Sequence, residues 1–240
     1  MQKGGNDYWT GKIQSMRRFI FLFGVLILLA GTSVSFAQTD DFGIWMSVGA
    51  EKKIDKWTFE LEQELRTMEN SGEIERIGTM VGLDYKLLKP LKVGLSYQFI
   101  TLNDLENEDM QPRHRINMYA QGKYEWHRFT FSLRERFQLT YKDETERTYK
   151  MNPKWSLRSK LKIDYNIPDS PISPFVSFES FYQLNNPDKN KFDGLRYSAG
   201  GRYKINKHHG IELFGLVDKE INTKNPVQRF VLGTAYVYSF

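Results

Sequence analysis

The sequence predicts an all-β protein that folds as one antiparallel up-and-down barrel, and three observations predict it. From Asp41 onward, apolar and polar residues alternate with a period of two, the pattern of strands with one apolar and one polar face. No window shows a comparable helical stripe. The breaks in the alternation are short and long in turn, as in hairpins that open toward opposite ends of a barrel.

Eleven segments carry this alternation, and the clearest are residues 57–66, 91–99, 129–141 and 195–205. A bacterial barrel with both chain ends in the periplasm needs an even number of strands. We therefore expect about ten strands, in a range of roughly 10–12, and the segment near Phe42 is then not a full strand. In order, the segments begin near Phe42, Trp57, Ile74, Leu91, Arg113, Phe129, Lys154, Phe175, Leu195, Ile211 and Gln228.

The breaks between the alternating segments contain residues typical of turns or are strongly polar. The short ones lie at residues 88–90, 127–128, 168–171 and 206–210, and the longer ones at 103–111, 143–152, 185–191 and 222–226. The segments between them run for roughly 10–15 residues, whereas a tilted strand of about 9–11 residues crosses a bilayer and a soluble strand averages about 5–6. Short turns at one end and longer loops at the other are typical of outer-membrane barrels.

Three features predict that the apolar face points outward, so that the fold class is a single antiparallel up-and-down transmembrane β-barrel. The polar face is highly charged, as suits a wet, narrow lumen. Aromatic residues lie near strand ends, where membrane barrels carry aromatic girdles. Tyr236, Tyr238 and Phe240 resemble the C-terminal assembly signal of such barrels. The alternative is a soluble exported, lipocalin-like barrel that binds an apolar ligand inside.

The N-terminal segment has the three parts of a secretory signal. Met16-Arg17-Arg18 supplies a positive start, residues 19–30 an apolar stretch, and residues 31–37 a small-residue cleavage site. We expect Met16 to be the true start, residues 1–37 to be removed, and residues 38–240 to form the barrel domain in the bacterial outer membrane. The alternative is an uncleaved anchor helix.

Charge and cysteine content exclude several classes of function. The chain has 34 basic and 29 acidic residues, but without residues 1–37 the numbers are 30 and 28, which leaves no electrostatic footprint for nucleic acid. The absence of cysteine excludes a disulfide scaffold, a cysteine-ligated metal and a lipoprotein anchor. The expected partners are outer-membrane lipid and the barrel-assembly machinery, with a surface ligand at the outer loops left open.

Three segments carry a family resemblance. Residues 38–45, 57–66 and 236–240 resemble the bacterial domain of unknown function 2490 family, and the resemblance covers essentially the whole exported chain. It implies an outer-membrane β-barrel with no established activity. No catalytic or binding residue carries over from the family.

Charged residues on the polar face are the candidates for a functional site. Glu60, Glu62 and Glu64 share one face of a predicted strand, so they could form an acid–base pair or a calcium site. The favoured interpretation is a salt-bridge network that fills a narrow lumen, because unpaired charges there are costly. The expected members are Glu60, Glu62, Glu64, Arg134, Arg136, Arg158, Lys160 and Arg202.

Catalysis is not expected. His114 lies near the outer end of a strand and could act as a general base beside a serine, but the Gly-x-Ser-x-Gly motif is absent. His127 and the pair His208 and His209 are expected in solvated turns rather than in a metal site. The sequence thus predicts a narrow channel or a structural or surface-interaction barrel without cofactor or metal; a rim-located lipid-modifying hydrolase using His114 is an alternative.

Overall fold

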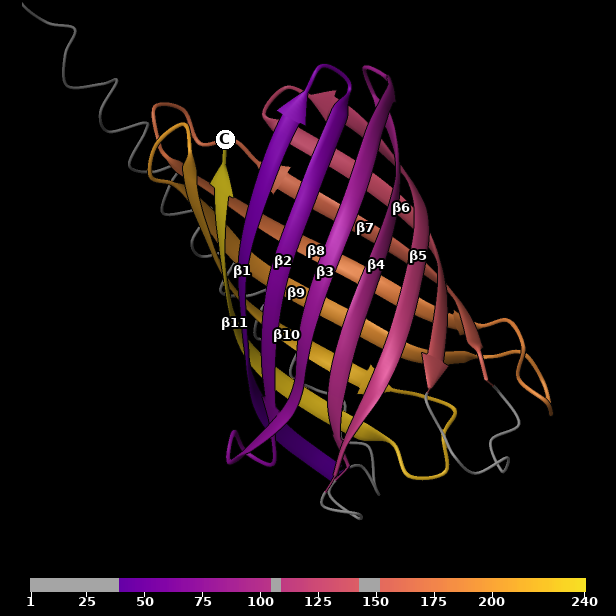
Figure 1. Cartoon of the computed structure of the whole chain (residues 1–240). Coiled ribbons are helices and arrows are strands. Elements are labelled where there is room, and N and C mark those ends of the chain that lie inside the picture. Colours follow the sequence, from indigo (N-terminus) through magenta and orange to yellow (C-terminus); the bar gives the residue numbers. More distant parts are fainter. Residues whose placement is uncertain (1–38, 105–108, 143–151) are drawn as a thin grey trace, which may run out of the picture. The chain divides into compact units, whose positions relative to one another are not determined.

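The computed structural model describes residues 39–104, 109–142 and 152–240, which form a closed barrel of eleven strands (Figure 1). No helix in these residues is long and apolar enough to cross a membrane. The predicted signal peptide, its start at Met16 and its cleavage site lie outside the described residues. The strands are β1 (Thr39–Ile54), β2 (Trp57–Met68), β3 (Glu73–Leu88), β4 (Leu91–Asp104), β5 (Asp109–Trp126), β6 (Phe129–Lys142), β7 (Lys154–Tyr165), β8 (Ile172–Gln183), β9 (Phe192–Lys204), β10 (His209–Glu220) and β11 (Val227–Ser239).

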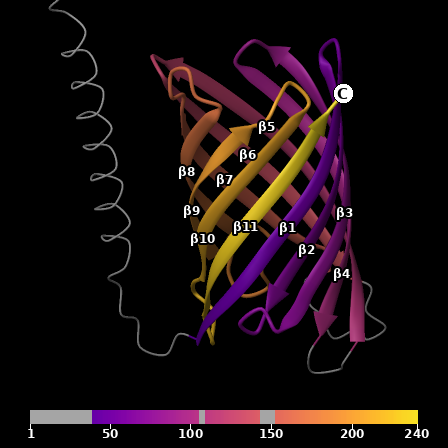
Figure 2. The ribbon, with the colours of Figure 1, turned by 90° about the vertical axis from the view of Figure 1, so that its left-hand side faces the viewer.

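Neighbouring strands in the chain are neighbours in the barrel and run antiparallel, whereas the closing pair is parallel. β1 and β11 pair in unbroken register, from Thr39 beside Val227 to Glu51 beside Ser239. Figure 2 shows the two strands side by side with their arrows in the same direction. The all-β, up-and-down prediction is confirmed, but the barrel is not antiparallel throughout.

The expected strand number of about ten is wrong, because the segment near Phe42 is a full strand. β1 runs for 16 residues and pairs with both β2 and β11. The even-number rule holds only when the first and last strands are antiparallel. A parallel ladder also satisfies the backbone groups of both edges, so an odd number of strands closes equally well.

The parallel seam places the start of β1 and the end of β11 at opposite ends of the barrel. We call one end the turn end: it holds the connections at residues 55–56, 89–90, 127–128, 166–171 and 205–208 and the end of β11. The other is the loop end: it holds the start of β1, the connections at residues 69–72, 184–191 and 221–226, the ends of β4 and β6, and the starts of β5 and β7.

Tight turns at the turn end rely on residues with a positive φ. Asp55 has a φ of 52° and His127 a φ of 55°, each in a two-residue connection between paired strands. Asp tolerates this left-handed conformation better than most residues, and His more than β-branched ones. These short hairpins fix the register of β1 with β2 and of β5 with β6.

Alternation along each strand separates an outer from an inner face. The outer face carries apolar residues on every strand, such as Val48, Leu95, Leu133, Leu161 and Leu213, all exposed. The inner face is mainly polar, but Trp45, Leu216 and Val231 form a small buried apolar cluster with Phe214 against it. Phe214 fills the space left by Gly233, where a Cβ atom would collide with its ring.

Candidate functional site

Several inward-facing residues of the barrel interior are almost completely buried. Ile100 of β4, Asn117 of β5 and Glu179 of β8 all face inward, and these residues are 1%, 2% and 3% exposed. These strands come from opposite sides of the barrel wall (Figure 1). The interior therefore behaves as a packed polar core, and its charged side chains form the candidate site.

A first ion cluster centres on Glu64 of β2. Its two carboxylate oxygens lie 2.6 Å from the Arg66 guanidinium and 2.7 Å from that of Arg76. The Gln98 amide donates a further hydrogen bond of 3.3 Å to Glu64. Gly78 on β3 leaves room for this carboxylate, because a Cβ there would lie 3.2 Å from it.

A second ion cluster centres on Glu179 of β8. Arg158 approaches one carboxylate oxygen to 2.9 Å, and Arg196 approaches the other to 3.8 Å. Arg196 also pairs with Asp218 at 2.6 Å, and Arg158 donates to the Gln138 side chain at 3.1 Å. Both oxygens of Glu179 are thus committed to arginines.

Trp45 joins the two clusters. The Arg66 guanidinium lies 3.5 Å from the centroid of the Trp45 ring, and the Arg196 guanidinium lies 4.8 Å from it. Cation–π contacts of this kind are strongest where both partners are desolvated. The indole packs against Leu216 and Val231, so it connects the polar core to the apolar cluster.

A third group lies nearer the turn end, around Asp84 of β3. Lys92 contacts this carboxylate at 2.5 Å, and the Tyr119 hydroxyl donates a hydrogen bond to it. The guanidinium groups of Arg134 and Arg136 each lie 5.8 Å from the Tyr119 ring centroid. Gly94 leaves room for this contact, because a Cβ at that position would collide with Asp84 and Tyr119.

The structure brings only part of the expected charge network into ion pairs. Glu64 and Arg158 belong to the two clusters, and Arg202 pairs with Glu212 at 3.1 Å. Within the described part of the chain, the remaining members lack an ion pair, although they face the interior: Glu60, Glu62, Arg134, Arg136 and Lys160.

Sequence reasoning missed several partners that the network uses. Arg66, Arg76, Arg196 and Glu179 hold its best contacts, and Trp45 lies between its two halves. Alternation could have placed each of them on the inner face. It could not have shown which inward residues meet, since the ion pairs depend on the register between neighbouring strands and the contact of Trp45 with Arg196 depends on closure of the barrel.

Three of the four histidines have a hydrogen-bond partner for a ring nitrogen, and the fourth, His127, packs edge to face against Trp126. The Tyr97 hydroxyl lies 2.7 Å from His114 Nδ1 on the outer face, and the Phe99 ring packs 5.5 Å from the imidazole. No hydrogen bond joins His114 to a serine among the residues described. His208 Nδ1 lies 2.7 Å from the Ser239 carbonyl, and His209 Nδ1 lies 2.6 Å from the Tyr236 hydroxyl.

Metal binding finds no support in the described ranges. They contain no group of three or more His, Asp or Glu side chains arranged to hold a metal ion. Glu60, Glu62 and Glu64 therefore do not form a three-carboxylate metal site there, and the structure places Glu64 among arginines.

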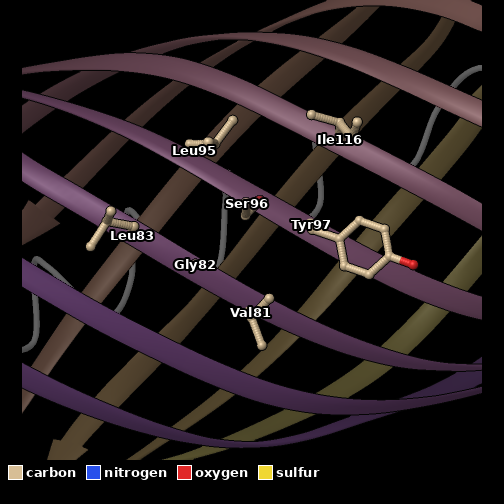
Figure 3. A pocket seen from close by; sticks show the side chains of 7 residues that line it. All are labelled: Val81, Gly82, Leu83, Leu95, Ser96, Tyr97 and Ile116. Carbon is tan, nitrogen blue, oxygen red and sulfur yellow. The ribbon is translucent and has the colours of Figure 1, made fainter.

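A shallow apolar groove of about 350 Å³ crosses the outer face over β3 and β4 (Figure 3). Val81, Leu83, Leu95, Tyr97 and Ile116 form its walls. Gly82 and Ser96 form its floor, because their positions turn inward and leave no side chain on the outer face. The groove offers hydrocarbon contacts and no charged group.

Comparison with known proteins gives a family and no function. No curated protein matches the chain. A family described as protein of unknown function (DUF2490) matches residues 42–229, a range that runs from the beginning of β1 into β11. This range includes both ion clusters but only residues 227–229 of β11, so no register pair of the parallel seam lies wholly inside it. Because the match covers most of its length, the chain belongs to the DUF2490 family.

Proposed function

We propose that this protein spans the bacterial outer membrane as a barrel with a closed lumen. The main support for this proposal is the outer face, on which large apolar side chains are exposed around the whole circumference. Val48 on β1 is 59% exposed, Leu95 on β4 52%, and Leu213 on β10 59%. A continuous apolar belt of this extent is costly in water and is satisfied by lipid.

The aromatic residues support this location. At the turn end, Trp57 packs on Tyr85 at 4.5 Å and Phe129 on Tyr165 at 5.0 Å, measured between ring centroids. At the loop end, Tyr182 packs on Phe192 at 4.9 Å. Two such belts fit the two membrane interfaces, where Trp and Tyr are enriched.

The polar interior argues against the soluble alternative. A lipocalin-like barrel places apolar residues inside around an apolar ligand, whereas this barrel holds Glu64, Glu179 and their arginines inside. The apolar groove over β3 and β4 then accommodates an acyl chain of the surrounding lipid.

The packed interior favours a structural or surface-interaction role over that of an open channel. Inward residues with almost no exposed area, such as Ile100, Asn117 and Glu179, support a closed lumen. We infer that the loop end faces outward and carries the interaction surface. We also infer that the protein is not an enzyme, because Tyr97 occupies His114 Nδ1 on the outer face, away from the interior.

Fractionation and lipid quenching test the membrane location. The protein should sediment with the outer membrane and resist extraction by alkali. After refolding into vesicles of brominated phosphatidylcholine, the outer residues Trp57 and Trp155 should be quenched while the inner Trp45 is shielded; single-tryptophan variants separate the three. Recovery in the soluble periplasmic fraction would contradict the proposal.

Planar-bilayer recording tests the closed lumen. The refolded barrel should insert without steady ion conductance, with an open porin of similar size as the positive control. Reproducible unitary conductance of the wild-type protein would instead support the channel interpretation.

A further inference from the structure

A separate cavity lies inside the barrel toward the turn end, between β5, β6, β7, β9 and β10. Its volume is about 310 Å³. At about 30 Å³ per water molecule, this space holds roughly ten waters or one small solute. Five cationic side chains line it: Lys123, Arg134, Lys160, Lys162 and Arg202. We call this cavity the vestibule.

The acidic residues of the vestibule offset only two of these cations. Lys162 lies 3.4 Å from Asp164 and 3.6 Å from Glu212, and Arg202 lies 3.1 Å from Glu212. Among the residues that the structure describes, Lys123, Arg134 and Lys160 have no carboxylate within ion-pair distance. The vestibule therefore carries a local excess of positive charge.

Two of the uncompensated cations lie directly opposite each other. Arg134 of β6 and Lys160 of β7 are register partners on the inner face. Like charges at such positions destabilise a sheet. On the other side, Lys160 faces Glu179 of β8, but Arg158 and Arg196 occupy both oxygens of that carboxylate. A bound anion would relieve the repulsion that the protein itself leaves in place.

We propose that the vestibule binds a small multivalent oxyanion, such as a phosphate ester or a polycarboxylate. Arg134, Lys160 and Lys123 supply charged donors, and charge-assisted hydrogen bonds are the ones that such anions form most strongly. The neutral side chains of Gln121, Thr130 and Ser132 complete the lining. This inference rests on the interior geometry and does not depend on the membrane location proposed above.

The first test measures anion-dependent stability of the refolded full-length protein in detergent. Inorganic phosphate and citrate are the probes, and sodium chloride at equal ionic strength is the control. Each probe should raise the melting temperature in a saturable manner, and calorimetry should give one site per barrel. No rise beyond that in sodium chloride, with either probe, would overturn the proposal.

Variants that remove one of these charges should raise the melting temperature without anion, whereas a purely structural role predicts that they lower it. Lys160→Gln and Arg134→Gln should each weaken phosphate binding about tenfold, the effect of one charge-assisted hydrogen bond. Without anion, each should melt at a higher temperature than wild type, because the cross-strand repulsion is gone. Lower melting temperatures with an unchanged phosphate response would show that both residues only support the fold.

Lys154→Gln is the matched control. Lys154 carries the same charge on the same strand but pairs with Asp193 at 2.6 Å near the loop end, outside the vestibule. This variant should bind phosphate as wild type does. An equal loss of binding in Lys154→Gln and Lys160→Gln would mean a diffuse charge effect and would contradict a defined site.

Two further probes distinguish the source of the phosphate group. Glycerol 3-phosphate and dihexanoyl phosphatidic acid carry the same phosphate monoester, but only the second has acyl chains. Binding of both at similar affinity assigns the vestibule to a free solute. Binding of the lipid alone, abolished in Lys160→Gln, assigns it to a lipid headgroup.

Discussion

Arg229 of β11 donates a hydrogen bond of 2.7 Å to Asp41 of β1, across the parallel seam that closes the barrel. The same guanidinium reaches Glu75 of β3 at 2.8 Å. At the other end of the seam, Ser239 donates to the Glu51 side chain at 2.6 Å. Because parallel pairing is slightly less stable per residue than antiparallel pairing, these side chains strengthen the closing ladder where it needs support.

Arg229→Gln should lower the free energy of unfolding by about 1.5–3 kcal/mol, because it leaves the two partly buried carboxylates of Asp41 and Glu75 without their arginine partner. Urea titration of the refolded barrel measures the change. Ser239→Ala removes a single hydrogen bond at the far end of the seam and should cost only about 1 kcal/mol. An Arg229→Gln barrel as stable as wild type would show that the backbone ladder alone closes the seam.

Strand positions could be predicted from the sequence because alternation is a local signal. The expected starts near Trp57, Leu91 and Phe129 coincide with β2, β4 and β6. Closure is not local. The pairing of Thr39 with Val227 depends on where every intervening hairpin leaves the final strand, so no window of sequence reveals that the seam is parallel.

For the candidate site, the sequence predicted which residues lie on the polar face of the strands but not which of them contact each other. Alternation put Glu64 and Arg158 on the polar side, but it does not give the register between neighbouring strands, which brings Arg76 of β3 to Glu64 and Glu179 of β8 to Arg158. Trp45 was also missed, although alternation with the exposed residues Met46 and Val48 puts it on the inner face. Its contacts with Arg66 and Arg196 could not be predicted from the sequence.

The parallel seam predicts that the start of β1 lies on the same side of the membrane as the loop end. The chain has no cysteine, so in a single-cysteine variant any maleimide labelling comes from the introduced residue. In intact cells, a membrane-impermeant maleimide should label Asp40→Cys and Lys224→Cys at the loop end, but not Lys207→Cys at the turn end. Permeabilising the outer membrane should expose all three. If Asp40→Cys and Lys207→Cys behaved alike in intact cells while Lys224→Cys behaved differently, the result would contradict the parallel seam.

Trp45→Ala should loosen the closed lumen. It removes an inward aromatic side chain that packs against Leu216 and Val231, a change that costs about 3–5 kcal/mol in a packed core. It also releases the two arginines stacked on the indole. We expect lower stability in urea and the appearance of ion conductance in planar bilayers. Trp155→Ala on the outer face is the control and should not conduct; a silent Trp45→Ala barrel would place the constriction elsewhere.

Leu133→Arg tests the direction of the outer face. If Leu133 faces lipid near the bilayer midplane, this change should cost roughly 2–4 kcal/mol of folding free energy in vesicles. Thr130→Arg, which adds the same group to the lining of the vestibule opposite Asp164, should cost less. The measurement is urea-dependent folding into phosphatidylcholine vesicles. The reverse order of the two variants would favour the soluble barrel with its outer face in water.

Tyr238 and Phe240 anchor the end of the seam, and they give the last prediction. Their rings meet edge to face at 4.8 Å between centroids, and the Phe240 amide donates to the Glu51 carbonyl at 2.9 Å. Phe240→Ala keeps the backbone bond but removes the ring from the turn end, where we expect the assembly machinery to meet the chain. Export should be unaffected, while the amount of heat-modifiable folded barrel in the outer membrane should fall sharply.

Purified Phe240→Ala should nevertheless refold in detergent nearly as well as wild type, since the seam ladder from Thr39 to Glu51 is intact. That contrast separates recognition during assembly from stability. Tyr124→Ala, which removes another exposed aromatic ring from the turn-end half of β5, serves as the control and should assemble normally. If Phe240→Ala assembled as efficiently as Tyr124→Ala in cells, the terminal aromatic residues would be a packed strand end and not an assembly signal.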